Sequence, residues 1–142
     1  MSTTRVSTAT AEWTSAVDLY GPRAVHDGSP LYQVKVLSDR RAEGGGLAYL
    51  LKTTPPKGKL VRIVAVARSD EHVFVLEGGG CNKSGKRLRF PGDYALNPEG
   101  QVHSAFYGAE SVSLVVYAGE PDEITSVDVV DIEPAAAGEE QV

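Results

Sequence analysis

The acid Glu71 and the base His103 are the residues of this sequence whose types and setting suggest chemistry. Because successive side chains of a strand point to opposite faces, Glu71 shares a face with Val73 and Val75. An acid on an apolar face needs a partner or a function. A carboxylate beside a histidine favours the imidazolium and tunes it as a general acid or base near neutral pH. Glu71 would then be the orienter or partner acid of a His103 base.

Tyr107 joins His103 as a candidate catalytic residue. Alternation over 102–107 places His103, Ala105 and Tyr107 on one face. We expect His103 to be the catalytic base, and Tyr107 to donate a proton or orient a substrate carbonyl. The structural alternatives are a hydrogen-bonding pair left in a barrel without chemistry, and an aromatic ring packed in the core.

The alternating segment 60–68 predicts the wall of a cavity. Its apolar residues fall on one face, and with two valines of the next segment they would line a pocket for a compact organic substrate. These candidate substrate-binding residues are Val61, Ile63, Ala65, Ala67, Val73 and Val75. The two alanines are small and would leave extra volume in this pocket.

The elements that must position these residues are strands. Short runs rich in Val, Ile, Leu and Tyr recur at roughly ten-residue spacing between Gly- and Pro-rich turns, which favours an all-β sandwich or barrel. A helical turn or two is expected around Ala11–Leu19, ended by Gly21-Pro22. The expected strands are Leu31–Leu37, Leu47–Thr53, Leu60–Ala67, His72–Leu76, Arg87–Phe90, Tyr94–Asn97, Val102–Tyr107, Val112–Tyr117 and Ile124–Val130.

Length, charge and hydropathy bound the class of protein. The 142 residues suit one domain, and the net charge of −5 divides into an acidic stretch from Glu120 and a remainder of +3. No basic stripe with interleaved aromatics indicates nucleic-acid binding, and no apolar run approaches the length of a membrane span. We expect a cytoplasmic protein without a secretory signal. We predict a partly disordered segment 1–20, a β-barrel 21–132 and an acidic disordered tail 133–142, with an edge strand over Ile124–Ile132.

The loop Gly80–Lys86 matches the GxxxxGK skeleton of a phosphate-binding loop. It is followed by Arg87 rather than Ser or Thr, and it joins two expected strands rather than a strand and a helix. We therefore interpret it as a hairpin turn and expect its cysteine, Cys81, to be exposed. His26 falls in a predicted surface turn, from which an N-terminal segment folding over a barrel mouth would bring it to the site.

The two ends of segment 71–103 resemble the cupin family. The second cupin motif is matched at every spacing, with a tyrosine where asparagine is usual, by Gly92, Pro98, Gly100, His103 and Tyr107. The closing Glu and Gly of the first motif are matched by Glu71 and Gly78, and the VLEG strand is most similar to the cupin domain of ChrR anti-sigma factors. The resemblance covers Leu60–Gly119 and implies a single-domain jelly-roll barrel, the double-stranded β-helix.

The sequence departs from the metal-binding cupins at the His-x-His that usually precedes the glutamate. Ala65 and Ala67 stand in that place, so only Glu71 and His103 remain of the family's four ligands. Two protein ligands are normally too few to hold a transition metal. We predict no cofactor. A divalent metal (Fe, Mn, Ni or Zn) stays open, with His72 as a further ligand, although a neighbour of Glu71 on a strand points to the opposite face.

Three functions stay open from sequence. The first is a metal-independent enzyme (isomerase, cyclase or lyase) performing acid/base chemistry on a small carbonyl-bearing molecule. The second is a metal-dependent, dioxygenase-like cupin, and the third is a non-catalytic ligand-binding or sensor domain. Because small cupins often pair through sheet edges or faces, a homodimer is expected.

Overall fold

The computed structural model describes residues 2–135 as a β protein with very short helices. Residues 136–142, most of the predicted acidic tail, lie outside the described residues. The elements are β1 (Thr14–Ser15), α1 (Val17–Tyr20), η1 (Gly21–Ala24), β2 (Val25–His26), β3 (Ser29–Pro30), β4 (Tyr32–Asp39), η2 (Arg41–Glu43), β5 (Leu47–Thr53), β6 (Lys59–Val66), β7 (Glu71–Glu77), β8 (Tyr94–Asn97), β9 (Val102–Tyr107), β10 (Ser111–Tyr117) and β11 (Glu123–Asp131).

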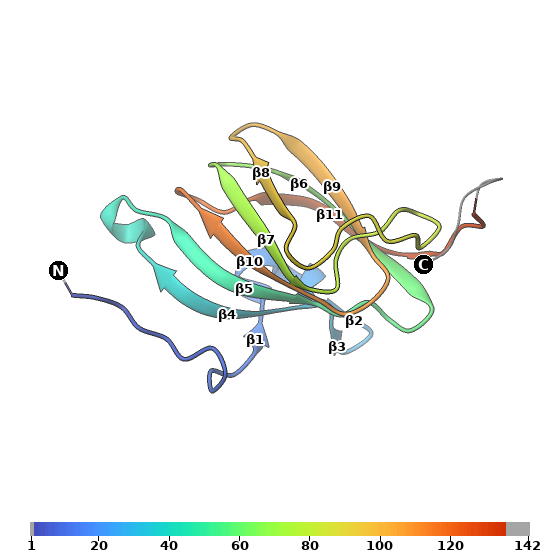
Figure 1. Ribbon diagram of the computed structural model, residues 1–142, viewed down its shortest axis with the longest axis horizontal. Coiled ribbons are helices and arrows are strands. Elements are labelled where there is room, and N and C mark those ends of the chain that lie inside the picture. The colour runs from blue at the N-terminus through green and yellow to red at the C-terminus, as the bar shows by residue number, and fades with distance from the viewer. Residues whose placement is uncertain (1, 136–142) are drawn as a thin grey trace.

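Two antiparallel sheets form the body of the molecule (Figure 1). The larger has the order β1-β4-β5-β10-β7-β8, and the smaller has the order β11-β6-β9. Val61 of the smaller sheet is completely buried in one hydrophobic cluster with residues of the larger sheet, so the two sheets pack against each other through their inner faces. A short hairpin of β2 and β3 stands apart from both sheets.

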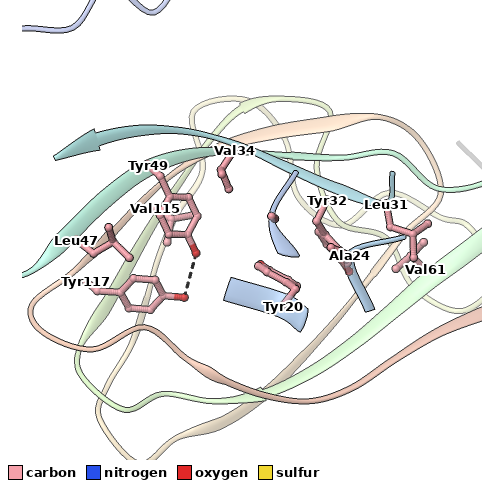
Figure 2. Packing of buried hydrophobic residues seen from close by; sticks show 11 residues of the cluster. Tyr20, Ala24, Leu31, Tyr32, Val34, Leu47, Tyr49, Val61, Val115 and Tyr117 are labelled. Carbon is pink, nitrogen blue, oxygen red and sulfur yellow. Dashed lines mark hydrogen bonds between the residues drawn. The ribbon is translucent and has the colours of Figure 1, made fainter. Parts of the chain in front are cut away.

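Tyrosines fill much of the space between the sheets. Tyr20 stacks on Tyr32 with ring centroids 4.4 Å apart, and the hydroxyls of Tyr49 and Tyr117 lie 3.5 Å apart (Figure 2). Tyr20 comes from α1, which ends at Gly21 with a φ of +66°, a conformation that glycine adopts readily. The N-terminal segment therefore contributes to the core, and its helix is about one turn, located at the C-terminal end of the predicted range.

Most expected strands are found, and three have the predicted bounds: β5, β8 and β9. The prediction of a strand over Arg87–Phe90 is wrong. The backbone N–H groups of Leu88 and Arg89 both donate to the carbonyl of Gly80, a turn-like pattern that leaves no regular ladder. Only an isolated bridge joins Arg87 to Cys81.

The loop after Gly80 is the tight turn that the sequence predicts. The side-chain carbonyl of Asn82 accepts hydrogen bonds from the backbone N–H groups of Ser84 and Lys86, so these donors are not free to cradle a phosphate. The expectation that Cys81 is exposed is wrong: Cys81 is 8% exposed, and its backbone N–H donates to the carbonyl of Phe106 in β9. Burial raises the pKa of its thiol, which disfavours the reactive thiolate.

Strand β11 closes the smaller sheet, as the sequence predicts. It pairs only with β6 and is therefore an edge strand. Its register places Ile124 beside Ala65, which in turn lies beside His103 on β9. The start of β11 thus lies two strands across from His103. Among residues 2–135, no helix is long and apolar enough to cross a membrane.

Candidate functional site

Three strand ends bring one histidine and two carboxylates together between the sheets. Glu71 opens β7, His103 lies near the start of β9, and Asp122 directly precedes β11. The Nε2 atom of His103 lies 2.7 Å from Oδ2 of Asp122 and 3.6 Å from Oε1 of Glu71. Both carboxylates are buried, and the histidine is partly so. We call Glu71, His103 and Asp122 the central trio.

Two neighbours on the larger sheet hold Glu71 in place. The Tyr117 hydroxyl donates to Oε2 at 2.7 Å, and the Asn97 amide donates to Oε1 at 2.8 Å. Burial raises the pKa of Glu71, and the negative charge of Asp122 adds to the rise, while these two hydrogen bonds oppose it. Glu71 is therefore a fixed carboxyl group whose ionisation is disfavoured relative to a carboxyl in water.

Asp122 controls the charge of His103. The hydrogen bond between the two side chains raises the pKa of His103, with partial burial acting against it. In the tautomer that donates Nε2–H to Asp122, the free lone pair of the ring lies on Nδ1. The aspartate thus fixes both the orientation of the ring and the nitrogen available to accept a proton.

Asp122 is not distinguished in the sequence, because it falls within the acidic stretch that begins at Glu120. A signal was available in the expected edge strand: once β11, β6 and β9 are neighbours in that order, the residue before β11 lies near His103. Alternation along one strand does not give the order of the strands in the sheet. The sequence alone therefore does not distinguish Asp122 from the acidic residues around it, which are expected to be solvated.

A cavity of about 220 Å³ adjoins the central trio. Its apolar wall includes Ile63, Val73 and Val75, as the sequence predicts, and Tyr107 also lines it. Burial raises the pKa of Tyr107 to about 12, which keeps its hydroxyl protonated at neutral pH.

Three other predicted wall residues do not line this cavity. Val61 is buried within the hydrophobic cluster. Ala65 and Ala67 are only 1% and 2% exposed, because neighbouring side chains pack over them, and they do not reach the cavity. They face the interior as alternation predicts, yet neighbouring atoms cover them. The small side chains therefore do not add volume to the cavity.

The two remaining histidines lie away from the central trio. His72 points to the outer face of β7, where its Nδ1 lies 2.6 Å from the Tyr94 hydroxyl. His26 lines a different pocket beside the β2–β3 hairpin, and its Nε2 lies 3.4 Å from a carboxylate oxygen of Asp27. Neither residue replaces a ligand missing from the cupin pattern.

The donor set of the central trio fits a divalent metal ion. One ligand atom from each of the three residues lies within 4.8 Å of the other two, and both carboxylates are buried. In addition, Oδ1 of Asp122 is buried without a hydrogen-bond partner. Nitrogen and oxygen donors of this kind suit zinc, iron, manganese and nickel. Asp122 thus supplies a third ligand that the sequence motifs do not contain.

Comparison with solved structures identifies the fold. A cupin-like protein of unknown function from Ralstonia eutropha aligns with a TM-score of 0.59 and 14% identity, over 87% of this chain and 77% of that one. The polyketide cyclase RemF from Streptomyces resistomycificus aligns at 0.56 and 17%, over 94% and 88%. Ectoine synthase from P. lautus aligns at 0.51 and 14%, over 87% and 95%. No protein-family profile matches the sequence, and no curated protein matches it.

The protein therefore has the cupin fold, and the predicted all-β cupin architecture is confirmed.

Proposed function

We propose that this protein is a small-molecule enzyme that performs acid/base chemistry inside the barrel. The observation that carries the proposal is the short contact between His103 and the buried Asp122 beside a largely apolar cavity. A carboxylate that orients a histidine and tunes its pKa is the arrangement that general acid/base catalysis requires. The cupin-fold structures named a cyclase and a synthase are consistent with such an enzyme.

The roles follow from protonation states. Neutral His103 would take a proton from a carbon next to a substrate carbonyl, with Nδ1 as the accepting atom and Asp122 stabilising the imidazolium that forms. Tyr107, protonated at neutral pH, would donate a hydrogen bond to the carbonyl oxygen, where negative charge develops. Glu71 would be the partner acid. Return of the proton to another atom gives an isomerisation, and loss of a leaving group from the adjacent carbon gives a lyase reaction. Attack of the carbanion on a second carbonyl carbon of the same molecule, whose oxygen then takes the proton, gives a cyclisation.

Hydrogen exchange tests this proposal without knowledge of the product. The protein is incubated in D₂O with a panel of compact ketones and aldehydes, and loss of the C–H signal next to the carbonyl is followed by NMR. We expect accelerated exchange for at least one compound, reduced by about a hundredfold or more in His103→Ala. Absence of exchange across the panel, or exchange that survives in His103→Ala, would contradict the proposal.

The second candidate is a metal-dependent, dioxygenase-like cupin, which the third ligand atom from Asp122 favours. Glu71, His103 and Asp122 would hold the ion, and the ion would act as a Lewis acid or as a centre for oxygen chemistry. Elemental analysis of the purified protein separates the two candidates. Stoichiometric iron, manganese, nickel or zinc, together with exchange that a chelator abolishes and the metal restores, would replace the metal-independent proposal.

The sensor alternative, the homodimer and the cytoplasmic location stay predictions. A sensor domain would bind a ligand in the cavity without exchange or turnover. Sedimentation velocity at two protein concentrations tests the homodimer. Exposed apolar side chains on the outer face of the larger sheet, including Phe74 and Leu96, are candidate dimer contacts. Variants at these positions are the first to compare with the wild type by sedimentation velocity.

A further inference from the structure

The central trio leaves one acceptor without a partner. Both oxygens of Glu71 accept hydrogen bonds, and Oδ2 of Asp122 contacts His103. Oδ1 of Asp122 is buried and has no hydrogen-bond partner within residues 2–135. A buried carboxylate oxygen without a donor is unfavourable, so a ligand that brings an N–H group to Asp122 gains what the free protein lacks.

The charges around the cavity favour a cation. Its lining includes two buried carboxyl groups, those of Glu71 and Asp122, and the partly buried imidazole of His103, whereas its other charged groups, Asp93 and Arg89, are exposed. When His103 is neutral, as the proposed base requires, no positive charge within the described residues lies beside the buried Asp122 carboxylate to balance it. Buried charges are normally paired, and a ligand ammonium supplies the missing positive charge.

A second lining residue also lacks a partner. Tyr32 is 1% exposed, and its hydroxyl makes no hydrogen bond within the described part of the chain. This residue lines the same cavity as Asp122. A hydroxyl sealed from water and unpaired in the protein is suited to donate to an oxygen atom of a bound ligand.

We propose that the cavity takes a small organic cation: a primary ammonium compound whose ammonium group binds Asp122 and whose carbonyl or hydroxyl oxygen accepts a hydrogen bond from Tyr32. The inference rests on the proposed function, because it places this ligand in the same cavity. It narrows the substrate class from carbonyl compounds in general to amino-carbonyl or amino-alcohol compounds. Asp122 can serve the ligand through Oδ1 while Oδ2 holds His103.

Matched probes test both contacts by NMR titration of the full chain. The probes are aminomethyl isobutyl ketone, its neutral counterpart hydroxymethyl isobutyl ketone, and isohexylamine, which keeps the amine and lacks the oxygen. We expect the amino ketone to bind at least about tenfold more tightly than either of the other two probes. One charge-assisted hydrogen bond to Asp122, or one hydrogen bond from the buried Tyr32 hydroxyl, accounts for a difference of this size. Asp122→Asn should abolish the preference for the amine, whereas Asp128→Asn, at an exposed position of β11, should retain it.

Tyr32→Phe provides a variant whose folding is not at risk from a lost hydrogen bond, since its hydroxyl has none to lose. It should bind the amino ketone and isohexylamine equally. Equal or tighter binding of the hydroxy ketone by the wild type overturns the proposal, as does an oxygen preference that persists in Tyr32→Phe. Binding of Zn²⁺ to the central trio without binding of the amino ketone also overturns the proposal. That result would show that a metal ion supplies the positive charge beside Asp122.

These titrations need no turnover. Selective binding without hydrogen exchange would contradict the proposed enzyme function and leave the ammonium site standing. Exchange on neutral ketones without any amine preference would support the proposed enzyme function and contradict the ammonium site.

Discussion

Two histidine pairs with similarly short contacts lie on opposite sides of β7, in opposite environments. Inside, His103 lies 2.7 Å from Asp122 next to Glu71, at the cavity. Outside, Nδ1 of His72 lies 2.6 Å from the hydroxyl of Tyr94, a residue that is 56% exposed. A short contact is therefore not what distinguishes a candidate site. The inner pair has a buried charged partner and a neighbouring cavity, so its hydrogen bond is made in a low-dielectric setting where electrostatic effects are strong.

Removing each histidine in turn tests the difference between the two pairs most directly. His103→Ala should lower the hydrogen-exchange rate by about a hundredfold or more, because the base itself is lost. His72→Ala should change that rate less than about twofold, because its contact with Tyr94 is solvent-exposed. The NMR exchange assay measures both. Comparable losses in the two variants would show that the inner face is not the site.

Changing the partner of His103 tests the same difference between the two pairs. Asp122→Asn removes the anion that raises the pKa of His103, so this pKa should fall. If neutral His103 is the base, the acidic limb of the pH–rate profile should move to lower pH, while the maximal rate falls by roughly tenfold or more because the ring is less well oriented. Asp128→Asn, at an exposed position of β11, should leave both quantities unchanged. An acidic limb that stays in place in Asp122→Asn would show that this limb does not report the ionisation of His103.

Two buried tyrosines allow a matched test of stability. Tyr117→Phe removes the donor to Glu71 and should lower the free energy of unfolding by about 1–3 kcal/mol, because a buried carboxyl oxygen is left without its partner. Tyr32→Phe removes a hydroxyl without a partner and should change it by less than about 0.5 kcal/mol. Urea unfolding measures both. A large loss in Tyr32→Phe would reveal a bond that the hydroxyl makes in solution.

The smallest expected effect is a pH dependence of stability. The pKa of Glu71 is raised in the folded state, so its contribution to stability is complete below its usual value of 4.5 and is lost as the pH rises through the folded value. His103, also raised, loses its contribution at higher pH, above its usual 6.5. Urea unfolding should therefore show stability falling as the pH rises above 4.5.

In Glu71→Gln the lower part of this fall should disappear and the upper part should persist. Glu77→Gln, at the exposed end of the same strand, serves as the control and should preserve the whole fall. A wild-type stability that rises with pH across this window would contradict the assignment to Glu71.

Much of the fold was predictable from the sequence, because local patterns determine it. Alternating apolar residues place β5, β8 and β9, and the glycine and proline turns separate them. The same alternation turned Glu71, His103 and Tyr107 inward, and the cupin motif spacing related Glu71 to His103. The error at Arg87–Phe90 arose where apolar residues were present but the backbone hydrogen bonds converged on Gly80.

Tertiary structure alone decided the chemistry around these residues. Asp122 belongs to an acidic stretch in the sequence and becomes a buried partner of His103 because β6 lies between β9 and β11. Likewise, Ala65 and Ala67 face inward by alternation, and only packing between the sheets determines that they do not line the cavity. Alternation along one strand gives the direction of a side chain. Its neighbours and its dielectric environment depend on contacts between segments that are distant in the sequence, and those contacts exist only in the folded protein.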